Sequence, residues 1–242
     1  MEKIYKNLIK GINQYFKKAK IRKAVIGLSG GIDSALSLKL VADAIGSSNV
    51  SALIMPEKGL TKKANVDDAV KLCRLLNIEF KIIPLNDFLK NFEKLPWKAN
   101  KIAAINTKSR IRANILYNYA NANNALVIGT SNKSELMLGY FTKYGDGAVD
   151  IEVIGNLYKT EVFELAKYLK LPSEFINKVP SAELFHGHTD EKELGASYNN
   201  IDKILKIVSK GKKPKGKLAE SIMKRIKDNE HKKKTAPIIK AR

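Results

Sequence analysis

Short apolar runs alternate with longer amphipathic segments along most of the chain. The runs occupy residues 24–28, 50–55, 80–85 and 125–130, and each has the length of a β-strand. Between them, apolar residues recur at intervals of three and four positions, which predicts helices. The predicted helices cover residues 4–19, 32–45, 64–76 (capped by Thr61), 101–122, 160–169, 198–208 and 218–226, with another starting at Asp190.

This alternation predicts an α/β fold, a doubly wound and mostly parallel sheet of the Rossmann-like kind with helices on both faces. Ligands of such sheets bind beyond the carboxyl ends of the strands, near the topological switch point. The loops after Leu28, Met55 and Thr130 should therefore meet at one cleft. The polar, glycine-rich stretch 131–147 is predicted to be a functional loop beside it.

The stretch Leu28-Ser29-Gly30-Gly31-Ile32-Asp33-Ser34 joins the first predicted strand to a helix. Adjacent glycines let the backbone approach a ligand, and the free amides of a first helical turn favour an anion. The stretch therefore predicts a phosphate site. Ser29 and Ser34 can add hydroxyl donors, and Asp33 makes sense beside phosphates if it holds a divalent cation. The alternative is an ordinary glycine turn capped by Ser and Asp.

Charge is distributed unevenly over the 242 residues. The formal net charge is +20, and residues 203–242 carry 15 Lys and Arg against 3 Asp and Glu, which is +12. We therefore expect a main domain over residues 1–210 and a basic C-terminal segment over 211–242. Such a segment suits RNA, a phosphate-rich small substrate, or solubility alone. The single Cys73 lies in an apolar pattern and excludes an intramolecular disulfide, and the sequence shows no membrane span or signal peptide. We expect a cytoplasmic protein.

The segment S-G-G-x-D-S at 29–34 resembles the pyrophosphate loop of the N-type ATP pyrophosphatases, which have an adenine nucleotide alpha hydrolase-like fold. That loop binds the β- and γ-phosphates of ATP, which leave together. Three further motifs, in order along the chain, together with 29–34 resemble ammonia-dependent NAD synthetases: 129–135 running on through 139–146, then 156–162, then 180–184 followed by 189–191. Four ordered motifs at matching spacing make this resemblance specific, and it covers nearly the whole chain.

The resemblance implies a ligase that forms a C–N bond. ATP adenylylates the carboxylate of deamido-NAD (nicotinate adenine dinucleotide), pyrophosphate leaves with Mg²⁺, and ammonia displaces AMP to give NAD. On the ATP side it implies a phosphate cradle of Gly27, Leu28, Ser29, Gly30, Gly31, Ile32, Asp33 and Ser34. It further implies Asp33 and Glu135 as magnesium ligands, Thr130, Lys159 and Ser181 as ATP contacts, and Asp33 with Lys159 as the catalytic pair. Each residue also has an alternative interpretation. Glu135 could be a carboxylate at the start of a helix whose cap is Asn132 or Ser134, and Lys159 could be an exposed lysine in the first turn of a helix.

On the dinucleotide side, the resemblance implies that Arg110, Lys143, Asp150, His231 and Lys232 contact deamido-NAD. In the alternative interpretations, which give these residues no binding role, Arg110 is a surface residue, Asp150 a strand-edge carboxylate and His231 a solvated histidine. The basic tail would close over the polyphosphate and order when substrate binds. Two positions depart from the family pattern, Glu183 where glycine is usual and His188 where glutamine is usual.

The resemblance also implies a homodimer, and we expect apolar residues within 102–119 to form its interface or to pack in the core. The chain leaves no room for a glutamine-hydrolysing domain, so we expect free ammonia as the nitrogen donor. We expect no specific nucleic-acid partner. Two alternatives stay open: a pyrophosphate-loop enzyme that modifies a tRNA base, and a nucleotide- or RNA-binding module without chemistry. The second would need no paired metal carboxylates, and an RNA-binding version would favour aromatic residues on an exposed sheet.

Overall fold

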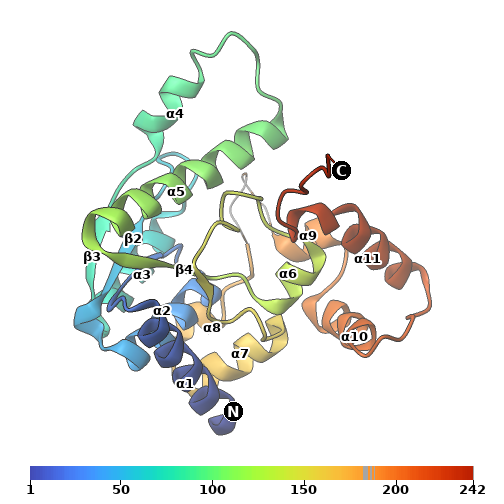
Figure 1. The fold of residues 1–242 in the computed structure, drawn as a ribbon, viewed down its shortest axis with the longest axis horizontal. Helices are drawn as coiled ribbons and strands as arrows, with labels where there is room; N and C mark the ends of the chain where they lie inside the picture. The colour runs from blue at the N-terminus through green and yellow to red at the C-terminus, as the bar shows by residue number, and fades with distance from the viewer. Residues whose placement is uncertain (182–184, 186, 188, 242) are drawn as a thin grey trace.

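The protein is described here from a computed structural model that places residues 1–181, 185, 187 and 189–241. In this part of the chain one five-stranded sheet has the order β3-β2-β1-β4-β5, and every neighbouring pair is parallel (Figure 1). The strands are β1 (Lys23–Gly27), β2 (Val50–Ile54), β3 (Glu79–Ile82), β4 (Ala125–Gly129) and β5 (Ile151–Glu152). The order reverses between β1 and β4, so the switch point predicted to bind ligand lies where these two strands end.

Helices cover both faces of the sheet, as the sequence predicts. The α-helices are α1 (Glu2–Ala19), α2 (Ile32–Ile45), α3 (Lys63–Leu75), α4 (Asn86–Phe92), α5 (Lys101–Asn123), α6 (Lys133–Leu138), α7 (Lys159–Tyr168), α8 (Ser173–Ile176), α9 (Asp190–Leu194), α10 (Tyr198–Ser209) and α11 (Lys217–Asp228). Short 3₁₀ turns cover Ser47–Asn49 and Glu230–Lys232. No helix among the placed residues has the length and apolar character to cross a bilayer.

Alternating side chains of the strands supply two apolar cores. Ile26 and Ile128 pack with α1, α2, α3, α7 and α8 on one face, whereas Val25, Leu53 and Val127 pack with α4 and α5 on the other. Because the central strands β1, β2 and β4 are largely buried on both faces, their sequences are mostly apolar instead of alternating. Cys73 lies in the first core as a free, buried thiol, as predicted.

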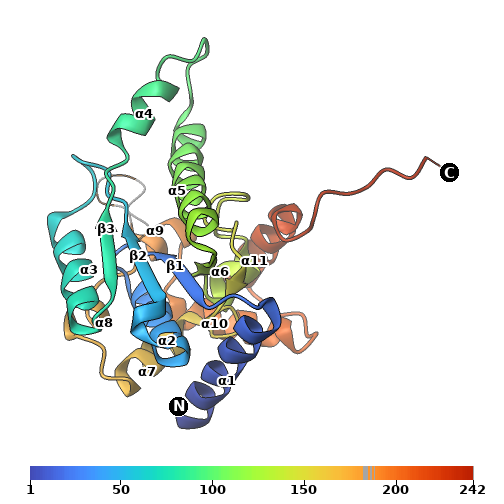
Figure 2. The same ribbon diagram turned by 60° about the vertical axis from the view of Figure 1, so that its left-hand side comes forward.

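A third apolar cluster stands apart from the sheet. It joins α6 and the start of α7 to the three C-terminal helices α9, α10 and α11, through residues such as Leu138, Leu205 and Ile222. In Figure 1, α10 and α11 lie beside α6, on the opposite side of the molecule from β3. After the second 3₁₀ turn the chain runs away from the body as an extended tail (Figure 2). The division of the chain at residue 210 stays a prediction.

Several local predictions need correction. The stretch 131–147 is not all loop, because α6 forms within it, closed by a capping box between Asn132 and Glu135. Helix α3 is capped at Lys62 and not by the side chain of Thr61, whose hydroxyl instead accepts the Glu57 amide at 3.0 Å. The predicted strand 80–85 is shorter and begins at Glu79. Helices α4 and α8, strand β5 and both 3₁₀ turns were not predicted.

Candidate active site

The predicted phosphate loop follows β1 and enters α2 at the switch point. Its two serines hold the turn in shape: the Ser34 hydroxyl donates to the Gly31 carbonyl at 3.0 Å, and Ser29 Oγ accepts the Gly31 amide at 3.2 Å. Gly31 is the N-cap of α2 and has no side chain with which to cap this helix. The first-turn amides of Ile32, Asp33 and Ser34 have no intrahelical partner, and no side chain of the described residues caps them, which suits them to an anionic ligand.

Gly30 has a conformation that no other residue type adopts easily. Its φ is +81°, and a Cβ at this position would clash with the carbonyl oxygen of Asn65. The Gly30 carbonyl also accepts the Lys178 ammonium at 2.8 Å, and Lys178 is held by Asp68 of α3 at 2.7 Å. Sequence reasoning missed Lys178, which lies in a loop without a motif. The turn is thus fixed by contacts on both sides.

We expect Gly30→Ala to raise the KM for ATP by about 100-fold, because relieving the clash with Asn65 must move the amides of the phosphate loop. Gly11 provides the matched control. It lies within α1 and nothing approaches its added Cβ within 4 Å. Gly11→Ala should leave KM unchanged and stabilise the fold by about 0.5–1 kcal/mol. Steady-state kinetics and thermal melts of both variants test this, and an unaltered KM in Gly30→Ala would contradict it.

Asp33, Glu135 and Lys159 come together at the end of this loop, although 126 positions separate the first from the last. Lys159 Nζ donates to Asp33 Oδ2 and lies 3.6 Å from Glu135 Oε1. Asn132 adds a hydrogen bond of 2.9 Å to Asp33 Oδ1. Lys159 is only 2 % exposed, so its alternative interpretation as an exposed helix-start lysine is wrong.

Glu135 combines the two interpretations that the sequence left open. Its Oε2 accepts the Asn132 amide at 3.1 Å, and the Asn132 side chain accepts the Glu135 amide at 3.0 Å, so it is a helix-start carboxylate in a capping box. Its other oxygen, Oε1, lies 3.6 Å from Lys159 Nζ. The capping box therefore fixes the direction of the carboxylate without using both of its oxygens.

The charges of this cluster are strongly coupled. Burial and the neighbouring Asp33 raise the pKa of Glu135, against the opposing effect of Lys159. Burial alone would lower the pKa of Lys159, but Asp33 and Glu135 together hold it above its ordinary value. The ammonium therefore stays charged and offsets part of the repulsion between the two carboxyl groups.

Residues of α9 and α10 pack against the cluster of Asp33, Glu135 and Lys159. The Lys159 ammonium lies 5.2 Å from the centre of the Tyr198 ring, and the Tyr198 hydroxyl donates to the buried Asp190 at 3.4 Å. The Asp190 amide donates to the Pro180 carbonyl at 3.1 Å, which brings the predicted ATP contact Ser181 to the same edge. Thr130 follows β4 directly and leads to Asn132. The departures at Glu183 and His188 lie outside the described residues.

The residues predicted to bind the dinucleotide form a second group. Lys143 donates to the carbonyls of His231 at 2.8 Å and Lys234 at 3.1 Å, and Arg110 donates to the Lys143 carbonyl at 3.4 Å. Lys232 donates to the carbonyls of Gly139 at 2.8 Å and Phe141 at 3.0 Å. These partners are backbone carbonyls and not carboxylates, so these hydrogen bonds place no anionic group against the three cations.

Asp150 makes different contacts. Its carboxylate accepts the Val127 amide at 2.7 Å and the Tyr117 hydroxyl at 3.2 Å, and its backbone carbonyl accepts the Tyr15 hydroxyl at 2.6 Å. This is the strand-edge arrangement that the sequence offered as the alternative for Asp150. Burial and the Asp150 charge raise the pKa of Tyr117 to about 12, so the phenol keeps its proton.

Glu152 is a half-buried carboxylate near the cleft that sequence reasoning missed. Its Oε2 accepts the Ser131 amide at 3.1 Å, directly after Thr130. Burial raises its pKa to about 7, a rise that hydrogen bonds from Ser131 oppose and Asp146 increases. The folded protein therefore keeps this proton to higher pH than the unfolded chain, whose glutamates titrate near 4.5.

The stability contribution of Glu152 is therefore complete below about pH 4.5 and is lost as the pH rises to about 7. We expect Glu152→Gln, which carries no such charge, to be more stable than the wild type at pH 8 by up to about 3 kcal/mol. At pH 4.5 the difference should shrink. Urea unfolding of both proteins at the two pH values measures this, and equal differences at both would contradict it.

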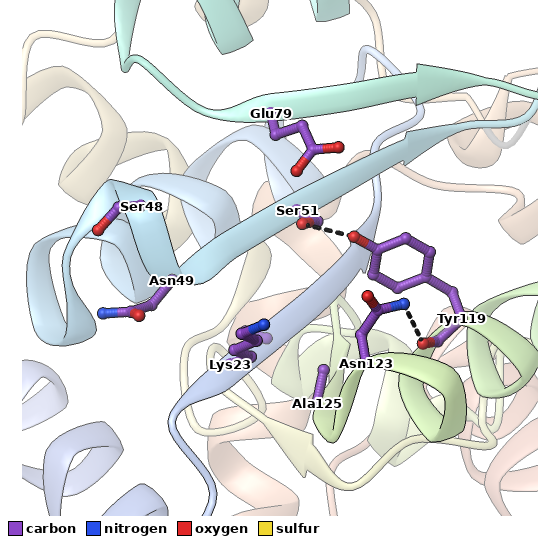
Figure 3. A pocket seen from close by; sticks show the side chains of 9 residues that line it. Lys23, Ser48, Asn49, Ser51, Glu79, Tyr119, Asn123 and Ala125 are labelled. Atoms are coloured by element: carbon purple, nitrogen blue, oxygen red, sulfur yellow. Dashed lines mark hydrogen bonds between the residues drawn. The ribbon is translucent and has the colours of Figure 1, made fainter.

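A small polar pocket lies at the opposite edge of the sheet (Figure 3). Residues at the starts of the strands line it, among them Lys23, Ser51, Glu79 and Ala125, and the Tyr119 hydroxyl donates to Ser51 Oγ at 2.9 Å. None of the predicted site residues lines this pocket. Because doubly wound sheets bind ligands at the carboxyl ends of their strands, we assign the site to the other edge.

A glycine turn with free helix-start amides at the switch point of a parallel sheet, beside two carboxylates and a buried lysine, is typical of nucleotide-binding α/β proteins. Sequence comparison identifies the family. Residues 4–236 match the model of the NAD synthase family, and the chain belongs to this family.

Individual relatives agree. An NH(3)-dependent NAD(+) synthetase of Archaeoglobus fulgidus is 47% identical over 218 residues, which are 90% of this chain and 88% of the relative. The NH3-dependent NAD synthetase structure of Campylobacter jejuni matches with a TM-score of 0.85 and 38% identity, over 99% of this chain and 98% of the other. The NMN synthetase structure of Francisella tularensis matches with a TM-score of 0.88 and 36% identity, over 98% of both chains. These comparisons confirm the predicted family and fold class.

Proposed function

We propose that this protein is a ligase that converts deamido-NAD to NAD with ATP and ammonia, releasing AMP and pyrophosphate. Family membership supports the reaction, and the contact of Lys159 with Asp33 and Glu135 at the end of the phosphate loop is the observation that carries the mechanism. A carboxylate is a poor acyl donor, so its conversion to an acyl adenylate makes attack by neutral ammonia feasible.

In the first step, an oxygen of the nicotinate carboxylate attacks the α-phosphorus of ATP, and the bond to the β-phosphate breaks. The amides of Ile32, Asp33 and Ser34 bind the departing pyrophosphate. Lys159 stabilises the negative charge that develops on the bridging oxygen. Its ammonium is almost completely buried beside carboxylates, so little water has to be removed from it when the phosphates approach. In the second step, ammonia attacks the acyl carbon, the C–O bond to AMP breaks, and the nitrogen loses a proton.

Asp33 and Glu135 fit magnesium. Both offer hard carboxylate oxygens, and Mg²⁺ is commonly held by one or two carboxylates together with substrate phosphates. The placed residues contain no group of three His, Cys, Asp or Glu able to hold a metal, so phosphate oxygens would supply further ligands. When bound, the ion neutralises charge on the departing pyrophosphate. Lys159, which now pairs with both carboxylates, would then be released toward phosphate.

The second group of residues supports binding of the dinucleotide. Arg110, Lys143 and Lys232 present charges held by backbone carbonyls, which suits a pyrophosphate bridge. His231 belongs to this group because its backbone carbonyl accepts the Lys143 ammonium. Its ring nitrogen Nδ1 lies 3.1 Å from the Asp228 carbonyl. We propose that the segment from residue 211 closes over this substrate, and that Asp150 contacts a ribose hydroxyl after leaving its strand-edge partners.

We further propose a cytoplasmic homodimer that uses free ammonia. A prominent projection, formed by α4, the start of α5 and the loop between them, supports dimerisation (Figure 1). It exposes Phe92, Trp97 and Ile102, the last at 70 %. In contrast, Ile111 and Leu116 of the predicted interface pack in the core. Sedimentation velocity with Trp97→Ser tests the interface.

One assay tests the reaction: release of AMP and pyrophosphate from Mg-ATP, with and without ammonium. Three acceptors are compared, which are deamido-NAD, nicotinate mononucleotide and tRNA. The mononucleotide is included because a matching structure is an NMN synthetase. We expect turnover with deamido-NAD that depends on ammonium. Turnover with tRNA alone would support the tRNA-modifying alternative, and preference for the mononucleotide would change the substrate while keeping the chemistry.

A further inference from the structure

Asp202 is a buried carboxylate outside the groups described so far. It lies on α10 and is 1 % exposed. Its Oδ1 accepts the hydroxyl of Ser134 at 2.5 Å, and its Oδ2 accepts the backbone amide of Thr160 at 2.9 Å. Ser134 Oγ in turn accepts the backbone amide of Lys159 at 3.0 Å. One carboxylate thus joins three helices through a largely buried chain of hydrogen bonds.

The two residues that Asp202 holds are the sequence neighbours of the active-site pair. Ser134 precedes Glu135 on α6, and Thr160 follows Lys159 on α7. The first two amides of α7, which have no partner inside the helix, are both satisfied by this network, one directly and one through Ser134. A carboxylate at this helix start is also favoured by the helix dipole. The network therefore fixes both helix starts relative to each other.

Asp202 also belongs to the C-terminal part of the chain. Helix α10 packs in the same apolar cluster as α11, which leads to His231 and Lys232. The tail is thus connected to Lys159 through α11, α10 and the hydrogen bonds that Asp202 and Ser134 make. A movement of α10 would be transmitted to the lysine and the carboxylate that meet ATP.

We propose that Asp202 is a positioning residue for adenylylation: from α10 it sets the separation of Glu135 and Lys159. It touches neither substrate nor metal and acts through Ser134 and the start of α7. The simpler alternative is a buried helix cap that serves stability alone. The two roles predict different results at temperatures where the variant is fully folded. Loss of a positioning residue lowers kcat there, whereas loss of a purely structural cap leaves kcat unchanged. This inference rests on the proposed reaction.

The decisive variant is Asp202→Asn, which keeps the shape of the side chain but replaces one accepting oxygen by a donating NH₂ group. We expect kcat for pyrophosphate exchange with ATP to fall about 10- to 100-fold, the usual effect of removing a partner that orients active-site groups, with KM values for ATP and deamido-NAD changed less than about threefold. Ser134→Ala should have a similar effect. The double variant should be no worse than the poorer single variant, because both remove one network.

Leu205→Ala is the matched control, since Leu205 is a fully buried residue on the same helix outside the network. It should lower the Tm at least as much as Asp202→Asn, and leave kcat unchanged below that Tm. Amide hydrogen exchange gives a readout independent of turnover. Exchange of the backbone amides of Lys159 and Thr160 should be faster in Asp202→Asn than in Leu205→Ala, even though Leu205→Ala has an equal or lower Tm.

A wild-type kcat in Asp202→Asn, or equal losses of kcat in the two variants, would overturn the positioning role. Additive effects in the double variant would do the same. Failure of the proposed reaction has a different signature, because the wild-type protein itself would then not exchange pyrophosphate with deamido-NAD present. In that case the exchange at the Lys159 and Thr160 amides still decides whether Asp202 holds them.

Discussion

Lys159→Met should reduce adenylylation of deamido-NAD by about 1,000-fold, the upper end of the loss found when one preorganised electrostatic group is removed from an active site. The methionine keeps most of the volume of the lysine side chain but has no charge. Asp33 and Glu135 then lose the cation that separates them. The measurement is pyrophosphate exchange with ATP in the presence of deamido-NAD, with substrate binding followed separately by calorimetry.

The same substitution should make stability depend on pH in a defined direction. Lys159 opposes the rise in the pKa of Glu135, so without it that pKa rises further above its ordinary value. A carboxyl group with a raised pKa contributes stability at low pH that is lost as the pH rises through that pKa. Because the pKa of Glu135 is already about 8 in the wild type, the Tm of the variant, relative to the wild type, should fall between about pH 8 and pH 9.5.

The exposed Lys167 on the same helix is the matched control. Lys167→Met should keep the exchange rate and the Tm at both pH values within experimental error of the wild type. If Lys159→Met retained more than about a tenth of the wild-type exchange, the lysine would be a structural counter-ion and not part of the reaction.

The central strands and the phosphate loop could be predicted from the sequence because local residues determine them. β1, β2 and β4 are largely buried on both faces and are therefore mostly apolar, with Lys23 and Ser51 as their only polar residues. The edge strands lack this signal: β3 exposes Glu79 and Lys81, and β5 has only two residues. Helix α6 has six residues, too few for a clear periodicity, and its capping box was its only signal.

The partners of the site residues could not be predicted in the same way. The burial of Lys159 depends on Asp33, which is distant in sequence, and a lysine at a helix start is ordinarily exposed. The positions of Arg110, Lys143 and Lys232 depend on backbone carbonyls, which any residue provides. Asp202 did leave a signal that sequence reasoning missed. It follows Ile201 and precedes Leu205 by three positions, on the apolar face of the predicted helix 198–208. An acid there is buried and needs partners.

Asp33→Asn and Glu135→Gln should each reduce adenylylation at least about 100-fold while the protein stays folded. In Asp33→Asn the shape is preserved and the bond from Asn132 can be kept, but the charge that pairs with Lys159 and would bind Mg²⁺ is lost. In Glu135→Gln the capping box survives, because glutamine replaces glutamate in this motif. Its side-chain oxygen can accept the Asn132 amide, so α6 should begin at the same residue.

Titration of Mg²⁺ distinguishes metal binding from simple charge balance. If these carboxylates hold the ion, both variants should need more Mg²⁺ for half-maximal exchange, and excess Mg²⁺ should restore part of the rate. Asp43→Asn on the same helix as Asp33 is the control, since Asp43 pairs with Lys39 away from the cleft. Its Mg²⁺ requirement should match the wild type. A collapsed circular dichroism melt of Asp33→Asn or Glu135→Gln would instead show that the ion cluster is needed mainly to hold α2, α6 and α7 together.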